Sequence, residues 1–287
     1  MPKPGAFVRI MRPVNCVMIG FAVIVGAALA GVNFSATSWL LFLYGFLTGF
    51  FLTAGSMVVN DIVDRDLDTV NEPARPIPSG AVSVRQAQIF AGVLAFAGFA
   101  FAWISARATS WLCLIIAVFS WLVFAAYSLW GKRSGFFGNL LVSVCVIVPF
   151  VYGGFAVGRG FAGSSAIFVV IAFLSNTGRE VTKGVVDVEG DKHKGVKTVA
   201  VHFGVHVAAV VAAMFYVSAV ILSVLPFWFG LVSVWFVPFV LVTDVGLIVS
   251  SVWLLRDFSR KNARRIKNLV LVWFVFGLMA FLAGTIG

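Results

Sequence analysis

Nine long apolar runs constrain this chain more than any other feature of its sequence. A helix rises 1.5 Å per residue, so about 20 consecutive apolar residues cross the hydrocarbon core of a bilayer. Backbone groups in lipid must be hydrogen-bonded within their own segment, and the runs therefore predict transmembrane helices. A charged fraction of 11% and a mean hydropathy of +1.05 exclude a soluble globular domain. The predicted spans are residues 14–31, 38–62, 84–105, 109–129, 137–157, 164–188, 205–225, 231–255 and 266–286.

The charges between the runs predict which way the chain crosses the membrane. When the runs are threaded in order, each of the 21 Lys and Arg residues except Arg107 and Arg159 falls on the side of the N-terminus. The positive-inside rule then makes the N-terminus cytoplasmic. The net charge of +10 reports this topology and an attraction to membrane lipids, and we expect no nucleic-acid partner. We predict an all-α multi-pass protein of the cell membrane, a single domain over residues 1–287 whose nine helices surround a central cavity.

Carboxylates gather where the second run ends, in the segment N-D-I-V-D-R-D-L-D at 60–68. Helix C-termini favour cations, so acids at this position are unfavourable unless a positive ion lies among them. If the helix continues, Asn60, Asp64 and Asp68 lie four residues apart on one face. Their oxygens suit Mg²⁺, which takes few protein ligands and shares the rest of its coordination with phosphates and water. We therefore expect the active site on the cytoplasmic side.

A second cluster of charges, R-E-V-T-K-G-V-V-D-V-E-G-D-K-H-K-G at 179–195, ends the sixth run. Arg179, Lys183, Asp187 and Asp191 step by four residues, so they share one helix face. A magnesium-diphosphate group held by both clusters would explain them, because carboxylates bind the metal while Lys and Arg bind phosphate oxygens. Two ordinary solvated loops are the alternative, but they do not account for acids in four-residue steps at the ends of apolar spans.

Two further segments hold polar groups on the same side of the membrane. The segment Y-S-L-W-G-K-R at 127–133 offers the Tyr127 hydroxyl and the Lys132 ammonium. The segment R-P-I-P-S-G at 75–80 has the proline and glycine of a fixed turn, which we expect to present Arg75.

Taken together, these motifs resemble the UbiA superfamily of intramembrane prenyltransferases. The resemblance runs through the whole chain, in order: R-P-V-N at 12–15, N-D-x-x-D-x-x-x-D at 60–68, R-P-I-P-S-G at 75–80, Y-S-x-x-x-K-R at 127–133 with Gly138 and Asn139, and D-V-E-G-D at 187–191 followed by G-V-K-T-V. The segment R-E-V-T-K is most similar to the archaeal branch that makes digeranylgeranylglyceryl phosphate. The segment N-E-P-A-R-P-I-P-S-G is also similar to chlorophyll synthases.

The resemblance implies Mg²⁺-dependent transfer of an isoprenyl group, geranylgeranyl in the archaeal branch, from its diphosphate to a lipid acceptor. For that branch the acceptor is the hydroxyl of geranylgeranylglyceryl phosphate, and the product belongs to archaeal ether-lipid synthesis. The implied metal ligands are Asn60, Asp64, Asp68, Asp187 and Asp191, with Asp61 in support. The implied substrate contacts are Arg75, Lys132 and Lys183 on the diphosphate, Tyr127 on the leaving group or cation, and Arg12 and Asn15 on the acceptor or phosphate side.

Two positions and two alternatives stay open at this point. Relatives in the archaeal branch usually carry an acid where this chain has Gly184, which leaves the second motif with Asp187 and Asp191. Asp244 lies deep in the eighth run, where a bare carboxylate is costly, so we expect it to hydrogen-bond a hydroxyl, amide or indole on a neighbouring span. An aromatic or chlorophyllide-like acceptor is one alternative. A cation-coupled transporter is the other, although it predicts charge distributed through the spans.

Overall fold

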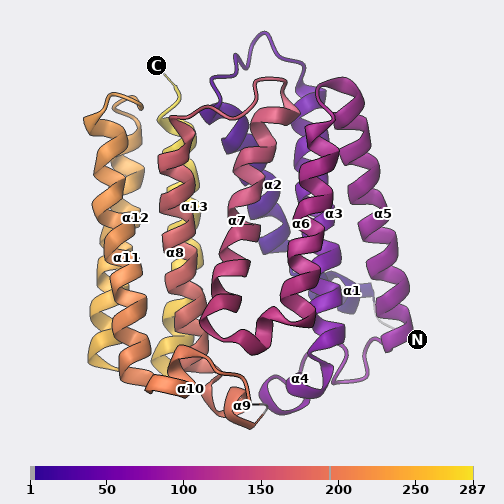
Figure 1. Ribbon diagram of the computed structural model, residues 1–287, viewed down its shortest axis with the longest axis vertical. Coiled ribbons are helices and arrows are strands. Elements are labelled where there is room, and N and C mark those ends of the chain that lie inside the picture. Colours follow the sequence, from indigo (N-terminus) through magenta and orange to yellow (C-terminus); the bar gives the residue numbers. More distant parts are fainter. Residues whose placement is uncertain (1–3, 194, 287) are drawn as a thin grey trace. The chain divides into compact units, whose positions relative to one another are not determined.

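The structure is a computed structural model that describes residues 4–193 and 195–286, apart from the side chains of Leu67, Val70, Asn71, Lys132, Arg133 and His193. In this part of the chain all regular structure is helical (Figure 1). The α-helices are α1 (Pro4–Met11), α2 (Pro13–Leu29), α3 (Trp39–Val63), α4 (Arg65–Asn71), α5 (Val84–Ala108), α6 (Leu112–Leu129), α7 (Phe136–Ala156), α8 (Ser165–Val186), α9 (Val188–His193), α10 (Val199–Phe203), α11 (Val205–Trp228), α12 (Phe236–Arg256) and α13 (Arg260–Ala283), and η1 (Gly131–Ser134) is a 3₁₀ turn.

Each predicted span coincides with one long helix, and the largest boundary errors lie at α12 and α13. Helix α12 begins at Phe236 rather than at residue 231. Helix α13 begins at Arg260 rather than at residue 266, because the Ser259 hydroxyl accepts a hydrogen bond from the Asn262 amide at 3.3 Å and caps a strongly basic first turn. Helix α1 was not predicted at all.

Most of the long helices are apolar enough to cross a membrane. Within the described residues, seven qualify by length and composition: α3, α5, α6, α7, α11, α12 and α13. Helices α1 and α2 together form an eighth apolar segment, bent by 48° at their junction. The protein is therefore a multi-pass, all-helical membrane protein. Helix α8 is not among these candidates, and its last third carries Arg179, Glu180 and Lys183.

The chain divides into two compact units, and the first comprises residues 1–128 with 148–161. In this unit α3 packs against α5, α2 and α1. Helices α2 and α7 approach very closely: a Cβ added at Gly26 would lie 2.1 Å from the Phe150 carbonyl oxygen, and one added at Gly153 would lie 2.0 Å from that of Val23. Glycine at both positions is what allows these two backbones to touch.

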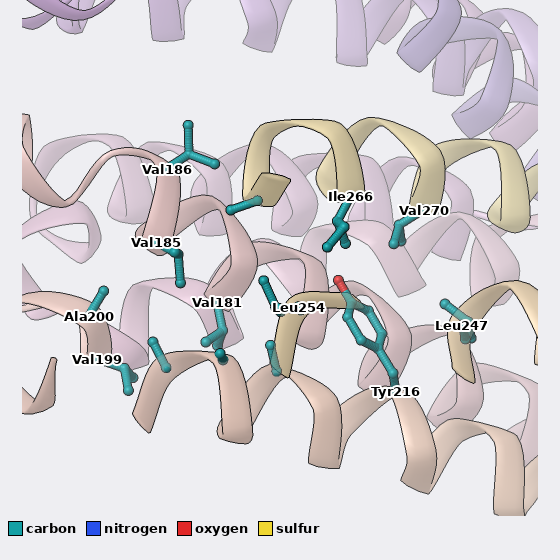
Figure 2. Close-up of a cluster of buried hydrophobic side chains, with 14 residues drawn as sticks. Val181, Val185, Val186, Val199, Ala200, Tyr216, Leu247, Leu254, Ile266 and Val270 are labelled. Carbon is teal, nitrogen blue, oxygen red and sulfur yellow. The ribbon is translucent and has the colours of Figure 1, made fainter. Parts of the chain in front are cut away.

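The second unit comprises residues 129–147 with 162–287. Helix α8 packs against α11 and α13, and α12 packs against the same two helices. Figure 2 shows their shared core, in which Tyr216 lies among aliphatic side chains that include Val181 and Ile266. The Tyr216 hydroxyl forms a 3.0 Å hydrogen bond with that of Thr182, so the one polar atom of this ring is satisfied. This core fixes α8 and α13 side by side.

Candidate active site at two helix junctions

The first acidic cluster lies where α3 ends and the short α4 begins. The helix does not continue unbroken through this segment, because Asp64 departs from helical geometry and separates the two helices. The backbone nevertheless keeps its four-residue step: the Asp64 amide donates to the Asn60 carbonyl at 2.9 Å, and the Asp68 amide donates to that of Asp64 at 2.8 Å. The side-chain amide of Asn60 donates to the Asp64 carboxylate at 2.9 Å. The predicted series therefore remains close together across the break.

Two arginines hold the buried acids of this junction. Asp61 is 2% exposed and lies 2.5 Å from the Arg12 guanidinium and 3.4 Å from that of Arg75. Arg75 also pairs with Asp68 at 2.5 Å, and Asp68 is 4% exposed. Burial without such partners would cost several kcal/mol per carboxylate. Asp61, predicted only as a supporting residue, is therefore the centre of the charge network of the first unit.

Arg12 reaches this network from a strained backbone. It is the one non-glycine residue with positive φ in the described chain, at φ 54° and ψ 66°, and it sits at the bend between α1 and α2. The left-handed region costs an L-residue about 1–2 kcal/mol. Pro13 disfavours right-handed helical geometry at the preceding Arg12, and the ion pair with Asp61 offsets part of the cost. Arg12 is thus fixed at the first aspartate motif, although the sequence could not show which acid it meets.

The predicted turn at Arg75 is confirmed. The Ser79 amide donates to the Arg75 carbonyl at 3.0 Å, and Gly80 adopts φ 73°, which glycine accommodates without strain. Ile77 of this turn packs into the core of the first unit, where Ile10 and Val58 are buried. The turn therefore holds Arg75 over α4 through packing as well as through its ion pairs.

The Asp68 carboxyl group binds its proton more tightly than an ordinary aspartate does. Burial raises its pKa to about 6, and the ion pair with Arg75 opposes this shift while the charges of Asp64 and Asp61 add to it. The carboxylate is ionised at neutral pH and becomes neutral under mild acid. A cation entering the cluster would favour the ionised form, because it would offset both the burial and the neighbouring acids.

The second acidic cluster repeats the geometry of the first. Asp187 interrupts the helical geometry between α8 and the short α9, as Asp64 does between α3 and α4. The Asp187 amide donates to the Lys183 carbonyl at 3.0 Å, and the Asp191 amide donates to that of Asp187 at 2.9 Å. Each aspartate motif thus has one acid at a helix junction and another one turn further, on a short helix. Both Asp187 and Asp191 are half-buried.

Gly184, where the resemblance led us to expect an acid, has room for a side chain. A Cβ added there would meet Thr198 at 3.6 Å, which is an ordinary van der Waals contact. The helix at Gly184 has no positive φ that would demand glycine. Packing therefore does not enforce a glycine at this position.

The remaining predicted residues are placed less fully. Tyr127 is half-buried near the end of α6, and Asn15 is half-buried on α2, where its amide lies 4.0 Å from the Met57 sulfur. Lys132 lies in η1, and its side chain is outside the described residues. Lys183 pairs with the buried Glu180 at 2.7 Å.

The donors of each motif, taken separately, fit magnesium in chemistry. They are carboxylate and amide oxygens, the hard ligands that Mg²⁺ prefers, presented at helix junctions. Among the described side chains no group of three or more His, Cys, Asp or Glu is gathered tightly enough to form a metal cage. Magnesium needs no such cage, because it commonly uses one or two carboxylates and completes its coordination with phosphate oxygens and water.

The prediction for Asp244 is confirmed. The Ser223 hydroxyl on α11 donates to the Asp244 carboxylate on α12 at 2.7 Å. A second polar contact ties α12 to α13, where the Trp273 indole donates to the Ser250 hydroxyl at 3.1 Å. Asp244 is thus part of the interhelical bonding of the second unit.

Sequence reasoning missed one charged centre, Glu180. It is 5% exposed and contacts Lys183 at 2.7 Å and the Arg179 guanidinium at 3.4 Å. The three-residue spacing of Glu180 and Lys183 was a local signal for this pair. The contact from the Arg179 side chain to the backbone of Lys267 on α13 had no such signal, because 88 residues separate the two.

Comparison with known proteins gives consistent relatives along the entire chain. The family model of the UbiA prenyltransferase family matches residues 19–284. The digeranylgeranylglyceryl phosphate synthase of Methanopyrus kandleri is 34% identical over 278 residues, which cover 97% of this chain and 98% of that protein.

Two solved structures share the fold. One, of a digeranylgeranylglyceryl phosphate synthase, superposes with a TM-score of 0.72 at 28% identity and covers 100% of this chain and 99% of its own. The other is a UbiA homologue from Archaeoglobus fulgidus bound to GPP and Mg²⁺. It superposes with a TM-score of 0.66 at 18% identity and covers 96% of this chain and 99% of its own.

Proposed function

The chain belongs to the UbiA prenyltransferase family, and we propose that it transfers a geranylgeranyl group from its diphosphate to the hydroxyl of geranylgeranylglyceryl phosphate. The observation that carries this proposal is 34% identity, over 97% of the chain, with a relative named digeranylgeranylglyceryl phosphate synthase. The product is an ether lipid phosphate of the archaeal type. All of residues 1–287 serve this one activity as a single prenyltransferase domain.

Magnesium is the proposed cofactor, supported by the Archaeoglobus fulgidus homologue that was solved with GPP and Mg²⁺. Asn60, Asp64 and Asp68 of the first motif, with Asp187 and Asp191 of the second, supply its oxygen ligands. When bound, the metal neutralises charge that develops on the leaving diphosphate. Asp61 acts indirectly, because it holds Arg12 and Arg75 in place.

The chain's own residues assist the departure of the diphosphate. The bond between the allylic carbon and the diphosphate oxygen breaks, a bond forms from that carbon to the acceptor hydroxyl oxygen, and the hydroxyl proton is released. Arg75, Lys132 and Lys183 donate hydrogen bonds to the diphosphate oxygens as their charge grows, which is where such donors accelerate a reaction most. Tyr127 donates to the leaving group or stabilises the cation, and Arg12 and Asn15 serve the acceptor or phosphate side.

We place this chemistry at the cytoplasmic face of the cell membrane. The proposed topology has nine spans, with α8 crossing the membrane despite its polar last third and with the N-terminus in the cytoplasm. Support comes from the distribution of Lys and Arg along the chain, of which only Arg107 and Arg159 would lie outside.

The experiment is product formation by purified protein in detergent with magnesium and geranylgeranyl diphosphate. Each reaction receives one acceptor: geranylgeranylglyceryl phosphate, hydroxybenzoate, dihydroxynaphthoate or chlorophyllide. We expect product with the glyceryl phosphate alone. Product with an aromatic acceptor or with chlorophyllide instead would assign the chain to another branch of the family. No product with any acceptor would refute the proposed activity.

A further inference from the structure

The last third of α8 and the start of α13 form a positively charged cluster within the second unit. Arg179 and Lys183 on α8 both contact the buried Glu180. Lys267 on α13 lies within electrostatic reach of Arg179, Lys183, Arg264 and Asp187. The core beneath holds these side chains in place, because Val181 next to Glu180 and Ile266 next to Lys267 are both buried in it (Figure 2).

Arg179 is held rigidly in this cluster. Its side chain is 16% exposed, its Nε donates to the Lys267 carbonyl oxygen at 3.2 Å, and its terminal nitrogen lies 3.4 Å from Glu180. A guanidinium carries five N–H donors. As far as the described residues show, these contacts use two of them, so three remain for a ligand that accepts hydrogen bonds.

Lys267 is a second cation of this cluster, and no acid forms a close ion pair with it among the described residues. It is half-buried, and among the described acids none lies within 4 Å of its ammonium. Glu180 and Asp187 lie within electrostatic reach of this ammonium, but Glu180 is paired closely with Arg179 and Lys183, and Asp187 belongs to the second aspartate motif. Burying an unpaired ammonium beside other cations is unfavourable, so the cluster is suited to an anion that supplies the missing negative charge.

Charges that serve only to orient the chain in the membrane look different. Lys261, one turn before Arg264 on the same helix, is exposed, as such residues normally are. Arg179 is instead largely buried and held by the buried Glu180 carboxylate and the Lys267 carbonyl oxygen, and the Lys267 side chain is half-buried. Their arrangement is therefore that of a binding site with fixed donors.

We propose that Arg179 and Lys267 bind the phosphate monoester of the lipid acceptor, with Glu180 as the positioning residue that orients Arg179. The proposal rests on the proposed function and adds to it a separate phosphate subsite, formed by α8 and α13, for the second substrate. A terminal phosphate offers three acceptor oxygens and close to two negative charges at neutral pH, which match a fixed guanidinium and an ammonium. An acceptor without phosphate has no group for this site.

The test compares Lys267→Gln with Lys261→Gln, which removes the same charge from the same helix at an exposed position. In steady-state kinetics we expect Lys267→Gln to raise the KM for geranylgeranylglyceryl phosphate about tenfold or more, the effect of one charge-assisted hydrogen bond. The KM for geranylgeranyl diphosphate should not change, and Lys261→Gln should match the wild type in both. Lys267→Arg should restore most of the loss. An increase in the KM for the donor, or no increase in either, would overturn the proposal.

A binding measurement separates this inference from the activity. With EDTA present, intrinsic tryptophan fluorescence follows binding of geranylgeranylglyceryl phosphate, of geranylgeranylglycerol and of phosphatidylglycerol to the same detergent-solubilised proteins. We expect tight binding of the first alone, weakened about tenfold by Lys267→Gln and not by Lys261→Gln. Equal competition by phosphatidylglycerol would overturn the assignment in favour of a structural lipid. If the wild type makes no product yet binds in this way, the proposed function fails and the phosphate subsite stands.

Discussion

The role of Asp61 can be tested through stability, because it is buried and shared by two arginines. Asp61→Ala leaves the guanidiniums of Arg12 and Arg75 without their common partner. Removing one member of a buried charged pair costs about 3–5 kcal/mol. The two arginine side chains are each close to one-third exposed, so water replaces part of the loss, and we expect about 2–3 kcal/mol. This corresponds to a decrease in Tm of about 4–10 °C.

The matched control is Asp66→Ala, two residues before Asp68. Asp66 carries the same charge, but its side chain is 80% exposed and its contact with Arg65 is 3.5 Å long. Exposed pairs contribute at most about 1 kcal/mol, so the Tm of Asp66→Ala should fall by about 3 °C or less. The double variant Asp61→Ala with Arg12→Ala should lose less unfolding free energy than the sum of the losses in the two single variants.

Thermal unfolding is followed through cysteines that are inaccessible in the folded protein. Cys16 and Cys113 are buried and Cys145 is half-buried, so a thiol-reactive fluorophore reports unfolding in detergent. Cys16 lies on α2 in the same core as Ile10 and Val58, near the network under test. If Asp61→Ala lowers the Tm no further than Asp66→Ala does, the ion pairs of Asp61 do not stabilise the first unit and the reasoning is wrong.

Three further predictions concern single positions. Because burial raises the pKa of Asp68 from 3.8 to about 6, the folded state binds its proton more tightly, and without magnesium the Tm should decrease as pH rises from about 4 to about 6. Asp68→Asn should remove this slope, and an unchanged slope would refute it. Gly184→Ala should raise stability by about 0.5–1 kcal/mol, whereas Gly178→Ala, whose Cβ would lie 2.8 Å from the Tyr216 ring, should lower it by about 1–3 kcal/mol in thermal unfolding. Asp244→Asn should keep activity, because an amide still accepts from Ser223, whereas Asp244→Leu should lower the Tm; an inactive, stable Asn variant would contradict this.

Features imposed by the bilayer were predictable from the sequence. All nine predicted spans contain a long helix, since an apolar run in lipid has few alternatives. The four-residue steps at Asn60 and Asp187 were also readable, because hydrogen bonds along the backbone preserve them even where the helix breaks. Helix α1 was missed, since its eight residues are too few to stand out as a span.

Contacts between residues far apart in the sequence could not be predicted from local helical periodicity. Asp61 lies one position after Asn60, so the helical period removed it from the predicted metal face. Its partner Arg12 comes from 49 residues earlier in the chain. Glu180 and Lys267 were likewise missed, because their surroundings are created by the packing of α8 on α13. Local periodicity identified candidate ligands, and tertiary packing decides which charges meet.

The most direct test of the account is product formation by two variants, each lacking one acid at a helix junction. Purified Asp64→Ala and Asp187→Ala are incubated with magnesium, geranylgeranyl diphosphate and geranylgeranylglyceryl phosphate, beside the wild type and Asp66→Ala. We expect product from the wild type and from Asp66→Ala, its loss with EDTA and its return with added magnesium. We expect no product from either junction variant, although both should purify with a Tm close to that of the wild type. Undiminished product from Asp64→Ala and Asp187→Ala would contradict the claim that both aspartate motifs serve one metal-dependent transfer.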